Sequence, residues 1–301
     1  MRKCMNAKPS WDLYRTFAAV LEAGSLSGAA RRLGITQPSV ARHIEALEQM
    51  IGGTLFLRSQ RGLSPTDRAL ALRPFAEDLV ATANALVRAA SSADDEVAGT
   101  IRITAGEVFA VEHLPPLLAK LRHQHPALNI ELAPTDAVTD LLRREADIAL
   151  RMTDPTQQAL IARRLGKVTL GLFARRDYLQ RRGTPTFLAD LAGHDLIGTD
   201  TPSATSRAVL PMLPALGHAD FAMRVDSTLA QLALLRAGFG IGICQTVIAA
   251  RDTALVQILP DAFSLDLPLW IVMHEDLRTS RRCRVVFDTL ATGLTDLAVL
   301  T

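Results

Sequence analysis

Residues 24–48 predict two short helices joined by a tight turn, and no other segment constrains the fold as strongly. Ser25 can cap the first helix, and Gly34 can end it because glycine tolerates the left-handed conformation. Thr36 is a good N-cap for the second helix, and Pro38 lies in its first turn, where a missing N–H costs nothing. Such a helix-turn-helix can place its second helix in the major groove of DNA.

The second of these helices has two distinct faces. Val40, Ile44 and Leu47 recur at helical spacing and predict its buried stripe. The opposite side and the N-terminal end carry polar and basic groups, and glutamine can pair with adenine and arginine with guanine. The spacing alone also allows an ordinary three-helix bundle with a solvated outer face. We expect DNA contacts from Arg31, Thr36, Gln37, Pro38, Ser39, Arg42 and His43.

A third helix and a basic hairpin complete the predicted N-terminal domain. A helix over about residues 11–23 would bury Leu13, Phe17, Val20 and Leu21 on one stripe. Residues 54–66 predict a hairpin, a "wing", that carries Arg58 and Arg61. A basic hairpin alone is usually solvated surface, but directly after a helix-turn-helix it favours a second DNA contact, on phosphates or in the minor groove.

The charge distribution agrees with a nucleic-acid partner at the N-terminal end. Residues 1–73 hold 11 Lys and Arg against 5 Asp and Glu, a net charge of +6. The remaining residues hold 22 basic and 26 acidic side chains, a net charge of −4. A basic head on a mildly acidic body is typical of a DNA-binding domain attached to another module, although small domains often differ by a few charges.

A long linker helix is expected from Thr66 to about residue 92, followed by a polar hinge at residues 91–96. Pro74 should bend or break this helix, because proline removes one backbone hydrogen bond. An apolar seam repeats at spacings of three and four, which favours a coiled-coil homodimer over a helix packed on its own domain. The seam consists of Leu72, Phe75, Leu79, Thr82, Leu86 and Ala89.

Alternating strands and helices after residue 98 predict an α/β body with a mostly parallel sheet. Strands are expected at 101–104, 128–132 and 147–151, with helices at 111–125 and 137–145 between them. A strand at 167–174 would cross into a second lobe, with strands at 195–198, 222–225, 240–244 and 255–258, a return strand at 267–274 and a closing helix at 280–297. The predicted domains are 1–67, the linker 68–97 and the body 98–301, with lobe I at 98–167 and 269–301 and lobe II at 168–268.

Two lobes create a cleft, and ligands of α/β sheets bind at the carboxyl ends of strands. Three loops at these ends precede helices, whose free N–H groups can hold an anion. Arg151 could form a forked bond with an anionic effector or a salt bridge with Asp200 or Asp226, and Glu107 is expected to be a solvated loop carboxylate. The candidate effector residues are Thr104, Ala105, Gly106, Thr135, Arg151, Thr199, Thr201, Ser203, Asp226, Ser227 and Thr228.

The N-terminal residues closely resemble the LysR-type transcriptional regulators of bacteria, densely over residues 10–70 and more loosely beyond. The matching positions are Phe17, Val20, Gly24, Ser25, Ala29, Ala30, Leu33, Thr36, Gln37, Pro38, Ser39, Val40, Arg42, Ile44, Leu47, Glu48, Gly52, Leu55, Phe56, Arg58, Leu63 and Thr66.

This resemblance implies a winged helix-turn-helix head, a dimerising linker helix and a two-lobed body of the periplasmic-binding-protein (type 2) kind. It also implies base recognition through Gln37, Pro38, Ser39 and Arg42, minor-groove contact through Arg58, an effector in the cleft, and tetramer assembly. Ala41 stands where serine is usual and His43 where glutamine is common, so no operator sequence is carried over.

Other classes of protein have weaker support in the sequence. No run of 18 apolar residues and no signal-peptide core are present, so we expect no membrane partner and a cytoplasmic location. No catalytic set, metal-ligand spacing or cofactor motif is found, and the glycines at 238–242 precede a strand, the reverse of a phosphate loop. The alternatives are a solute-binding sensor, which would need export, or a redox regulator using Cys244 and Cys283.

Overall fold

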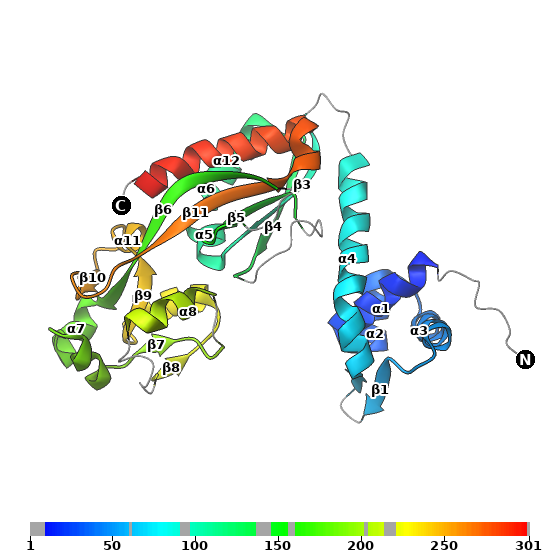
Figure 1. Ribbon diagram of the computed structural model, residues 1–301, viewed down its shortest axis with the longest axis horizontal. Coiled ribbons are helices and arrows are strands. Elements are labelled where there is room, and N and C mark those ends of the chain that lie inside the picture. Colours follow the sequence, from blue (N-terminus) through cyan, green and yellow to red (C-terminus); the bar gives the residue numbers. More distant parts are fainter. Residues whose placement is uncertain are drawn as a thin grey trace, which may run out of the picture. The chain divides into compact units, whose positions relative to one another are not determined.

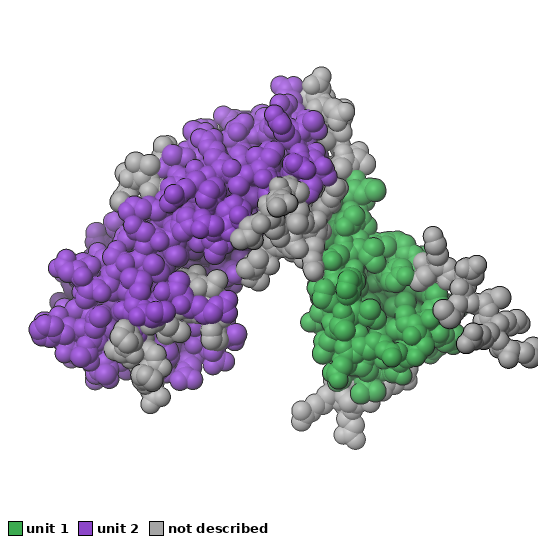
Figure 2. Space-filling view, in the orientation of Figure 1, with its two compact units in different colours: residues 1–89, 143–145 green, residues 90–142, 146–301 purple. Residues whose placement is uncertain are grey.

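The computed structural model describes residues 10–59, 62–90, 97–136, 146–155, 160–201, 204–213 and 221–299. The chain divides into two compact units, coloured separately in Figure 2. Unit 1 comprises residues 1–89 and 143–145, and unit 2 comprises residues 90–142 and 146–301. Arg61, Ser203, the hinge at 91–96 and the helix expected at 137–145 lie outside the described residues.

Unit 1 begins with three helices around one apolar core, as the sequence predicts. These are α1 (Trp11–Ala23), α2 (Leu26–Leu33) and α3 (Gln37–Ile51). Ser25 accepts a hydrogen bond from the backbone N–H of Gly28, and Thr36 accepts one from Ser39, so both predicted caps are confirmed. The buried side chains that join the three helices include Phe17, Val20, Ala29, Ala30, Val40, Ile44 and Leu47.

The predicted wing is present and is attached to α3. It consists of β1 (Phe56–Ser59) and β2 (Gly62–Pro65), which pair antiparallel. Glu48 Oε1 accepts hydrogen bonds from the backbone N–H groups of Leu55 at 2.6 Å and Phe56 at 3.3 Å. The Phe56 ring packs on Phe17 with centroids 5.8 Å apart. The wing therefore takes its position from the recognition helix and the head core.

The linker helix α4 (Asp67–Ala90) is continuous through Pro74, so the expectation of a break there is wrong. Thr66 caps it by accepting a hydrogen bond from Ala69 N–H at 3.2 Å. Ala69 and Ala76 are buried in the head core on either side of the proline, and this packing holds the flanking turns despite one lost backbone bond. Further along, large seam side chains face solvent: Phe75, Leu79 and Leu86 are 66%, 42% and 67% exposed.

Unit 2 is built on one seven-stranded sheet with the order β10-β6-β11-β5-β3-β4, and β9 also pairs with β6. The strands are β3 (Gly99–Ala105), β4 (Leu128–Pro134), β5 (Ile148–Arg151), β6 (Leu160–Arg175), β9 (Ile241–Gln245), β10 (Leu255–Ile258) and β11 (Leu265–His274). Strands β6 and β11 run antiparallel along the whole body, and α12 (Arg281–Val299) lies along them (Figure 1).

Two sets of elements gather on this sheet and form the two lobes. Lobe I contains β3–β5, α5 (Glu107–Glu112), α6 (Leu114–Gln124) and α12 around one apolar core. Lobe II contains β9, β10 and the elements α7 (Arg176–Arg182), η2 (Leu188–Gly193), β7 (Ile197–Gly198), α8 (Ala204–Val209), η3 (Leu210–Met212), β8 (Met223–Arg224), α10 (Thr228–Arg236) and α11 (Thr246–Ala249). The short η4 (Glu275–Thr279) joins β11 to α12.

Three details of the body differ from the sequence prediction. The sheet is mixed, because only β3 pairs parallel, with β4 and β5, whereas the crossing strands and their neighbours pair antiparallel. Strand β6 leaves lobe I and strand β11 returns to it, so the two strands must run in opposite directions. The helix expected at 111–125 is instead two helices, α5 and α6, that meet at His113, since Pro115 and Pro116 fit only a first turn. Strand β6 also begins earlier, at Leu160.

The glycine-rich segment after α10 acts as the sequence predicts, as a helix end and strand entry. Gly238 adopts a left-handed φ of 75°, and β9 begins at Ile241. At Gly240 the chain passes so close to Asp195 that an added Cβ would lie 2.0 Å from its carbonyl oxygen. At Gly242 the nearest atom, Ile197 Cδ1, would be 3.6 Å away, an ordinary contact.

We predict that Gly240→Ala destabilises unit 2 and that Gly242→Ala is tolerated. The alanine at 240 must displace backbone, and overpacking of this kind costs about 1–3 kcal/mol or more. Urea unfolding of both variants and of wild type measures the difference. Equal stability of the two variants would contradict the close approach at Gly240.

Candidate nucleic-acid interface and effector cleft

The N-terminal end of α3 is open and is held in place by bonds among its own polar side chains. Thr36, Gln37, Pro38 and Arg42 are exposed. Thr36 Oγ1 lies 2.9 Å from the Ser39 hydroxyl, which in turn accepts a hydrogen bond from Arg42 Nη2 at 3.4 Å. These contacts leave most of the donors of Arg42 on the solvent side, where a base edge or phosphate can reach them.

Gln37 connects α3 to the preceding helix. Its Oε1 accepts a hydrogen bond from the Ser27 hydroxyl at 3.2 Å, which leaves its amide NH₂ free to donate. Arg31 is exposed at the last turn of α2. Of the seven residues expected to contact DNA around the turn, the six other than His43 therefore lie on the last turn of α2, at the N-cap and on the first two turns of α3.

The remaining predicted DNA contacts are placed differently. His43 is half-buried, and its Nδ1 lies 2.8 Å from Oγ1 of the buried Thr16 on α1. The ring was expected on the outer face, but His43 is three residues after the buried Val40 and therefore borders the stripe that packs on α1. Arg58 lies on β1 opposite Leu63, one residue before the last pair of the hairpin, Ser59 and Gly62.

The strand ends of lobe I hold the predicted effector residues in a hydrogen-bonded set. The Thr104 hydroxyl is buried, donates to the Ala133 carbonyl at 3.1 Å and accepts from Arg151 Nη2 at 2.9 Å. Arg151 Nη1 also donates to the Leu150 carbonyl at 2.8 Å. Thr135 N–H donates to the Ala105 carbonyl at 2.8 Å. Thr104 thus holds the guanidinium at the end of β5.

Each of the three loops predicted to accept an anion from an effector already binds a carboxylate of this chain. Asp136 Oδ1 accepts from Glu107 N–H at 3.2 Å, at the start of α5. Asp226 Oδ1 accepts from the backbone N–H groups of Asp200 at 2.9 Å and Thr201 at 2.8 Å. These bonds, first those from Thr201, lower the pKa of Asp226.

The third loop is the start of α10, and here the carboxylate comes from the other lobe. Glu107 Oε2 accepts from the Ser227 hydroxyl at 2.6 Å and from Leu229 N–H at 3.2 Å. The Thr228 hydroxyl donates to Asp136 Oδ2 at 2.6 Å. Glu107 was expected to be a solvated loop carboxylate, and the structure corrects this. The residue next to the strand end reaches α10 because α5 begins directly after Gly106.

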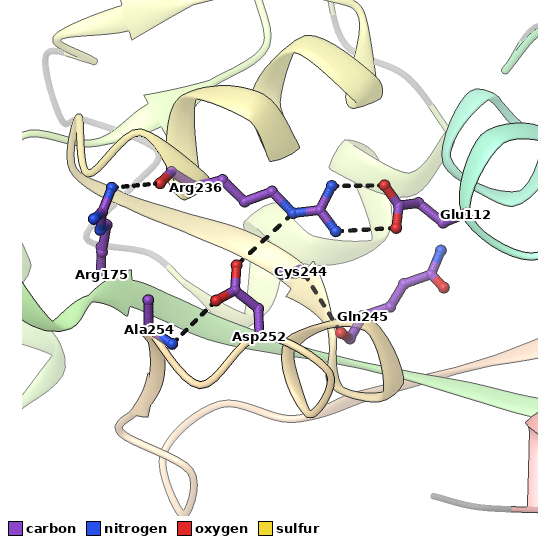
Figure 3. Close-up of polar contacts among 7 residues, drawn as sticks. All are labelled: Glu112, Arg175, Arg236, Cys244, Gln245, Asp252 and Ala254. Atoms are coloured by element: carbon purple, nitrogen blue, oxygen red, sulfur yellow. Dashed lines mark hydrogen bonds and ion pairs between the residues drawn. The ribbon is translucent and has the colours of Figure 1, made fainter.

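Glu112 and Arg236 form a further contact between the lobes, which no motif in the sequence indicates (Figure 3). Glu112 at the end of α5 binds Arg236 at the end of α10 through two bonds, of 2.6 Å and 2.9 Å. Arg236 Nε also lies 3.9 Å from Asp252 Oδ2. The backbone carbonyl of Arg236 accepts a hydrogen bond from Arg175 Nη1 at 3.0 Å. The two partners are 124 positions apart, and no local spacing pattern relates them.

A buried polar pair lies beside this ion pair. His113 Nε2 is 2.9 Å from Gln245 Oε1, and both side chains are buried. Burial lowers the pKa of His113, which therefore stays neutral at physiological pH. The nearby Cys244 is also buried, and burial raises the pKa of its thiol to about 12. Cys283 is also buried, and burial raises the pKa of its thiol. Both described thiols therefore stay protonated, and a protonated thiol is a weak nucleophile.

Among the described residues, no group of three His, Cys, Asp or Glu side chains is placed to hold a metal ion. The same part of the chain contains no helix that is both long and apolar enough to span a membrane.

Comparison with known families decides what these two regions are. Residues 11–70 match the bacterial regulatory helix-turn-helix protein, lysR family, and residues 94–295 match the LysR substrate binding domain. The second match alone covers more than half of the chain. The chain belongs to the LysR family of transcriptional regulators. It is thus a DNA-binding regulator with an effector-binding domain, and proteins of this family form oligomers.

Individual LysR proteins resemble the chain over nearly its whole length. The transcriptional regulator CrgA of Neisseria meningitidis is 27% identical over 286 residues, which cover 92% of this chain and 95% of that protein. The transcriptional activator TtdR of Escherichia coli is 27% identical over 297 residues, 94% of each. The full-length structure of CbnR complexed with its target DNA shares the fold, with a TM-score of 0.64 at 21% identity, over 94% of this chain and 99% of that one.

We predict that the Glu112–Arg236 pair makes the stability of unit 2 depend on pH. The hydrogen bonds from Arg236 hold the pKa of Glu112 below its ordinary value of 4.5. The contribution is therefore complete above pH 4.5 and is lost as the pH falls through the lowered pKa. Glu112→Gln should destabilise unit 2 at pH 7, and its deficit against wild type should shrink in acid.

Urea unfolding followed by Trp270 fluorescence, in a Trp11→Phe background, measures this deficit at neutral and acidic pH. Glu131→Gln, which removes an exposed ion pair with Arg102 within lobe I, is the matched control. A Glu112→Gln deficit of the same size at both pH values would contradict the prediction.

Proposed function

We propose that this LysR regulator recognises a pseudo-palindromic promoter site with α3 and the wing, and that a small molecule between the lobes controls it. The observation that carries the proposal is the exposed N-terminal end of α3, where Gln37 and Arg42 keep free donors. The amide of Gln37 and the guanidinium of Arg42 would recognise base edges. Arg31, Thr36, Pro38 and Ser39 would contact the backbone or base edges, Arg58 and Arg61 the minor groove or phosphates, and His43 would orient α3 through Thr16.

Dimer formation through α4 would give the spacing that a two-fold site requires. Two copies joined along the seam place two recognition helices about one DNA turn, ~34 Å, apart. The exposed Phe75, Leu79 and Leu86 support this, because three large apolar side chains on one helix are costly to leave in water. We expect dimers to pair as tetramers, and the functional division to follow residues 1–67, 68–97 and 98–301.

The effector would bind between the lobes, among the strand ends and loops predicted for it. The described members of that set, Thr104, Ala105, Gly106, Thr135, Arg151, Thr199, Thr201, Asp226, Ser227 and Thr228, lie at these ends and loops. We propose that the protein is not an enzyme and acts in the cytoplasm, where its DNA partner is found. The redox alternative loses support because Cys244 and Cys283 are buried.

The first test concerns specificity of DNA binding. Arg42→Ala should lower affinity for the preferred upstream site by about 1–3 kcal/mol, while non-specific binding changes little. Mobility-shift titrations on the promoter fragment and on a scrambled fragment measure both affinities, at two salt concentrations. Binding to each should weaken strongly with salt.

Arg181→Ala is the charge-matched control, since Arg181 is exposed on lobe II. If Arg42→Ala kept the ratio of specific to non-specific affinity, α3 would not be the recognition helix. Salt-independent binding would contradict the contacts to phosphates.

The second test concerns the dimer. Leu86→Glu should weaken the dimer by more than about tenfold, because it removes two buried leucines and places two carboxylates in the seam. Sedimentation velocity at several protein concentrations measures the change. Asn84→Glu, an exposed position on the same helix outside the seam, should leave the dimer intact. A Leu86→Glu variant as dimeric as wild type would place the interface elsewhere.

A further inference from the structure

Helix α10 of lobe II is bound at both of its ends by acidic side chains of lobe I. At its first turn, Glu107 binds Ser227 and Leu229, and Asp136 binds Thr228. At its last residue, Arg236 is bound through two hydrogen bonds by Glu112. Both glutamates belong to α5, one at its first residue and one at its last.

The charges at the two ends of α10 match these partners. A helix N-terminus carries a partial positive charge and free N–H groups, so it favours the Glu107 and Asp136 carboxylates. The other end carries the full positive charge of Arg236, with two parallel bonds to one carboxylate, the strongest arrangement for such a pair. The Glu112 side chain is 19% exposed, so solvent screens this pair less than a surface ion pair.

Helix α5 is shorter than α10 but can still bind both of its ends. Glu107 and Glu112 are five residues apart, about 7.5 Å along α5, whereas α10 is about 12 Å long. The extended side chains of Glu112 and Arg236 make up the difference, so α5 can lie along α10 and hold both ends at once. Just beyond α5, the buried contact between His113 and Gln245 continues the same junction toward the crossing strands.

We propose that α5 and α10 form a carboxylate clasp, made by Glu107, Asp136 and Glu112 of lobe I on α10, that keeps the two lobes closed when no effector is bound. This proposal rests on the proposed function in one respect, that an effector binds in this cleft and controls the protein. Glu107 takes the position at the α10 N-terminus that a carboxylate of the effector would need. An effector entering the cleft must therefore open the clasp, and control works by displacement of an internal group rather than by closing an empty cleft.

A purely local role of these side chains as helix caps makes a different prediction. A cap protects only the amides it binds, so loss of Glu107 would free Leu229 N–H and nothing further away. A clasp couples both ends of α10 to α5, so removal of its charges must loosen the two helices together.

Hydrogen–deuterium exchange of the full-length protein, followed by mass spectrometry, separates these roles. The variant carries Glu107→Gln with Glu112→Gln, which keep side-chain size and remove both charges. Amides of α5 and α10 should exchange together at least about fivefold faster than in wild type, as expected for loss of charge-assisted bonds. Strand β3 should be unchanged, and Glu131→Gln, which breaks an ion pair within lobe I, should exchange like wild type throughout.

Glu107→Gln alone gives the sharpest comparison. Faster exchange at the last turn of α5 and at residues 243–245, as well as at Leu229, supports the clasp. Acceleration confined to residues 228–231 would overturn it. Mobility shifts on the same samples test the proposed function separately: wild-type protein that binds no upstream DNA would overturn the regulator assignment, whereas the exchange data decide the clasp.

Discussion

The antiparallel pairing of β6 with β11 is the interaction on which the body depends. It extends from Leu265 opposite Leu170 to His274 opposite Leu160, so one ladder passes through both lobes. On β6 the apolar core of lobe I extends to Leu170, and that of lobe II begins at Leu172. Every other strand of lobe II in this sheet pairs with β6, and the strands of lobe I join through β11. The two lobes can move relative to each other only by bending this ladder.

In the head, close helix packing allows a short recognition helix to be rigid. Ala29 and Ala30 are buried between helices, and their small size lets α2 approach its neighbours closely. Glu48 then fixes the wing to the end of α3 opposite its N-terminal turn, where Thr36 and Gln37 are exposed. A binding site must be held within a fraction of an ångström, and this carboxylate restrains the wing relative to α3.

The sequence predicted the elements governed by local chemistry and missed those governed by tertiary pairing. The caps at Ser25 and Thr36, the wing and the linker helix follow from neighbouring residues, and all are present. The parallel pairing expected from alternating strands and helices holds for β3, β4 and β5, whereas β6 and β11 are antiparallel because the direction of each is set by which lobe it enters, not by its own composition. At Pro74 a bend or a break was expected, and the break is absent because burial of Ala69 and Ala76 against the head supports the helix on both sides. Long-range polar pairs such as Glu112 with Arg236 leave no pattern in the sequence at all.

The backbone N–H groups expected to bind an effector carboxylate instead bind carboxylates of this chain. The helix starts at Glu107 and Thr228, and the loop at Asp200 and Thr201, do attract carboxylates through their free N–H groups. The rule does not say whose carboxylate binds, and a tethered side chain pays far less entropy than a free ligand. Asp136, Asp226 and Glu107 therefore hold these positions at an effective concentration that a dissolved anion must exceed. An effector that carries an anion to these positions must therefore displace one of these groups, and an effector that leaves them in place must be bound by other contacts.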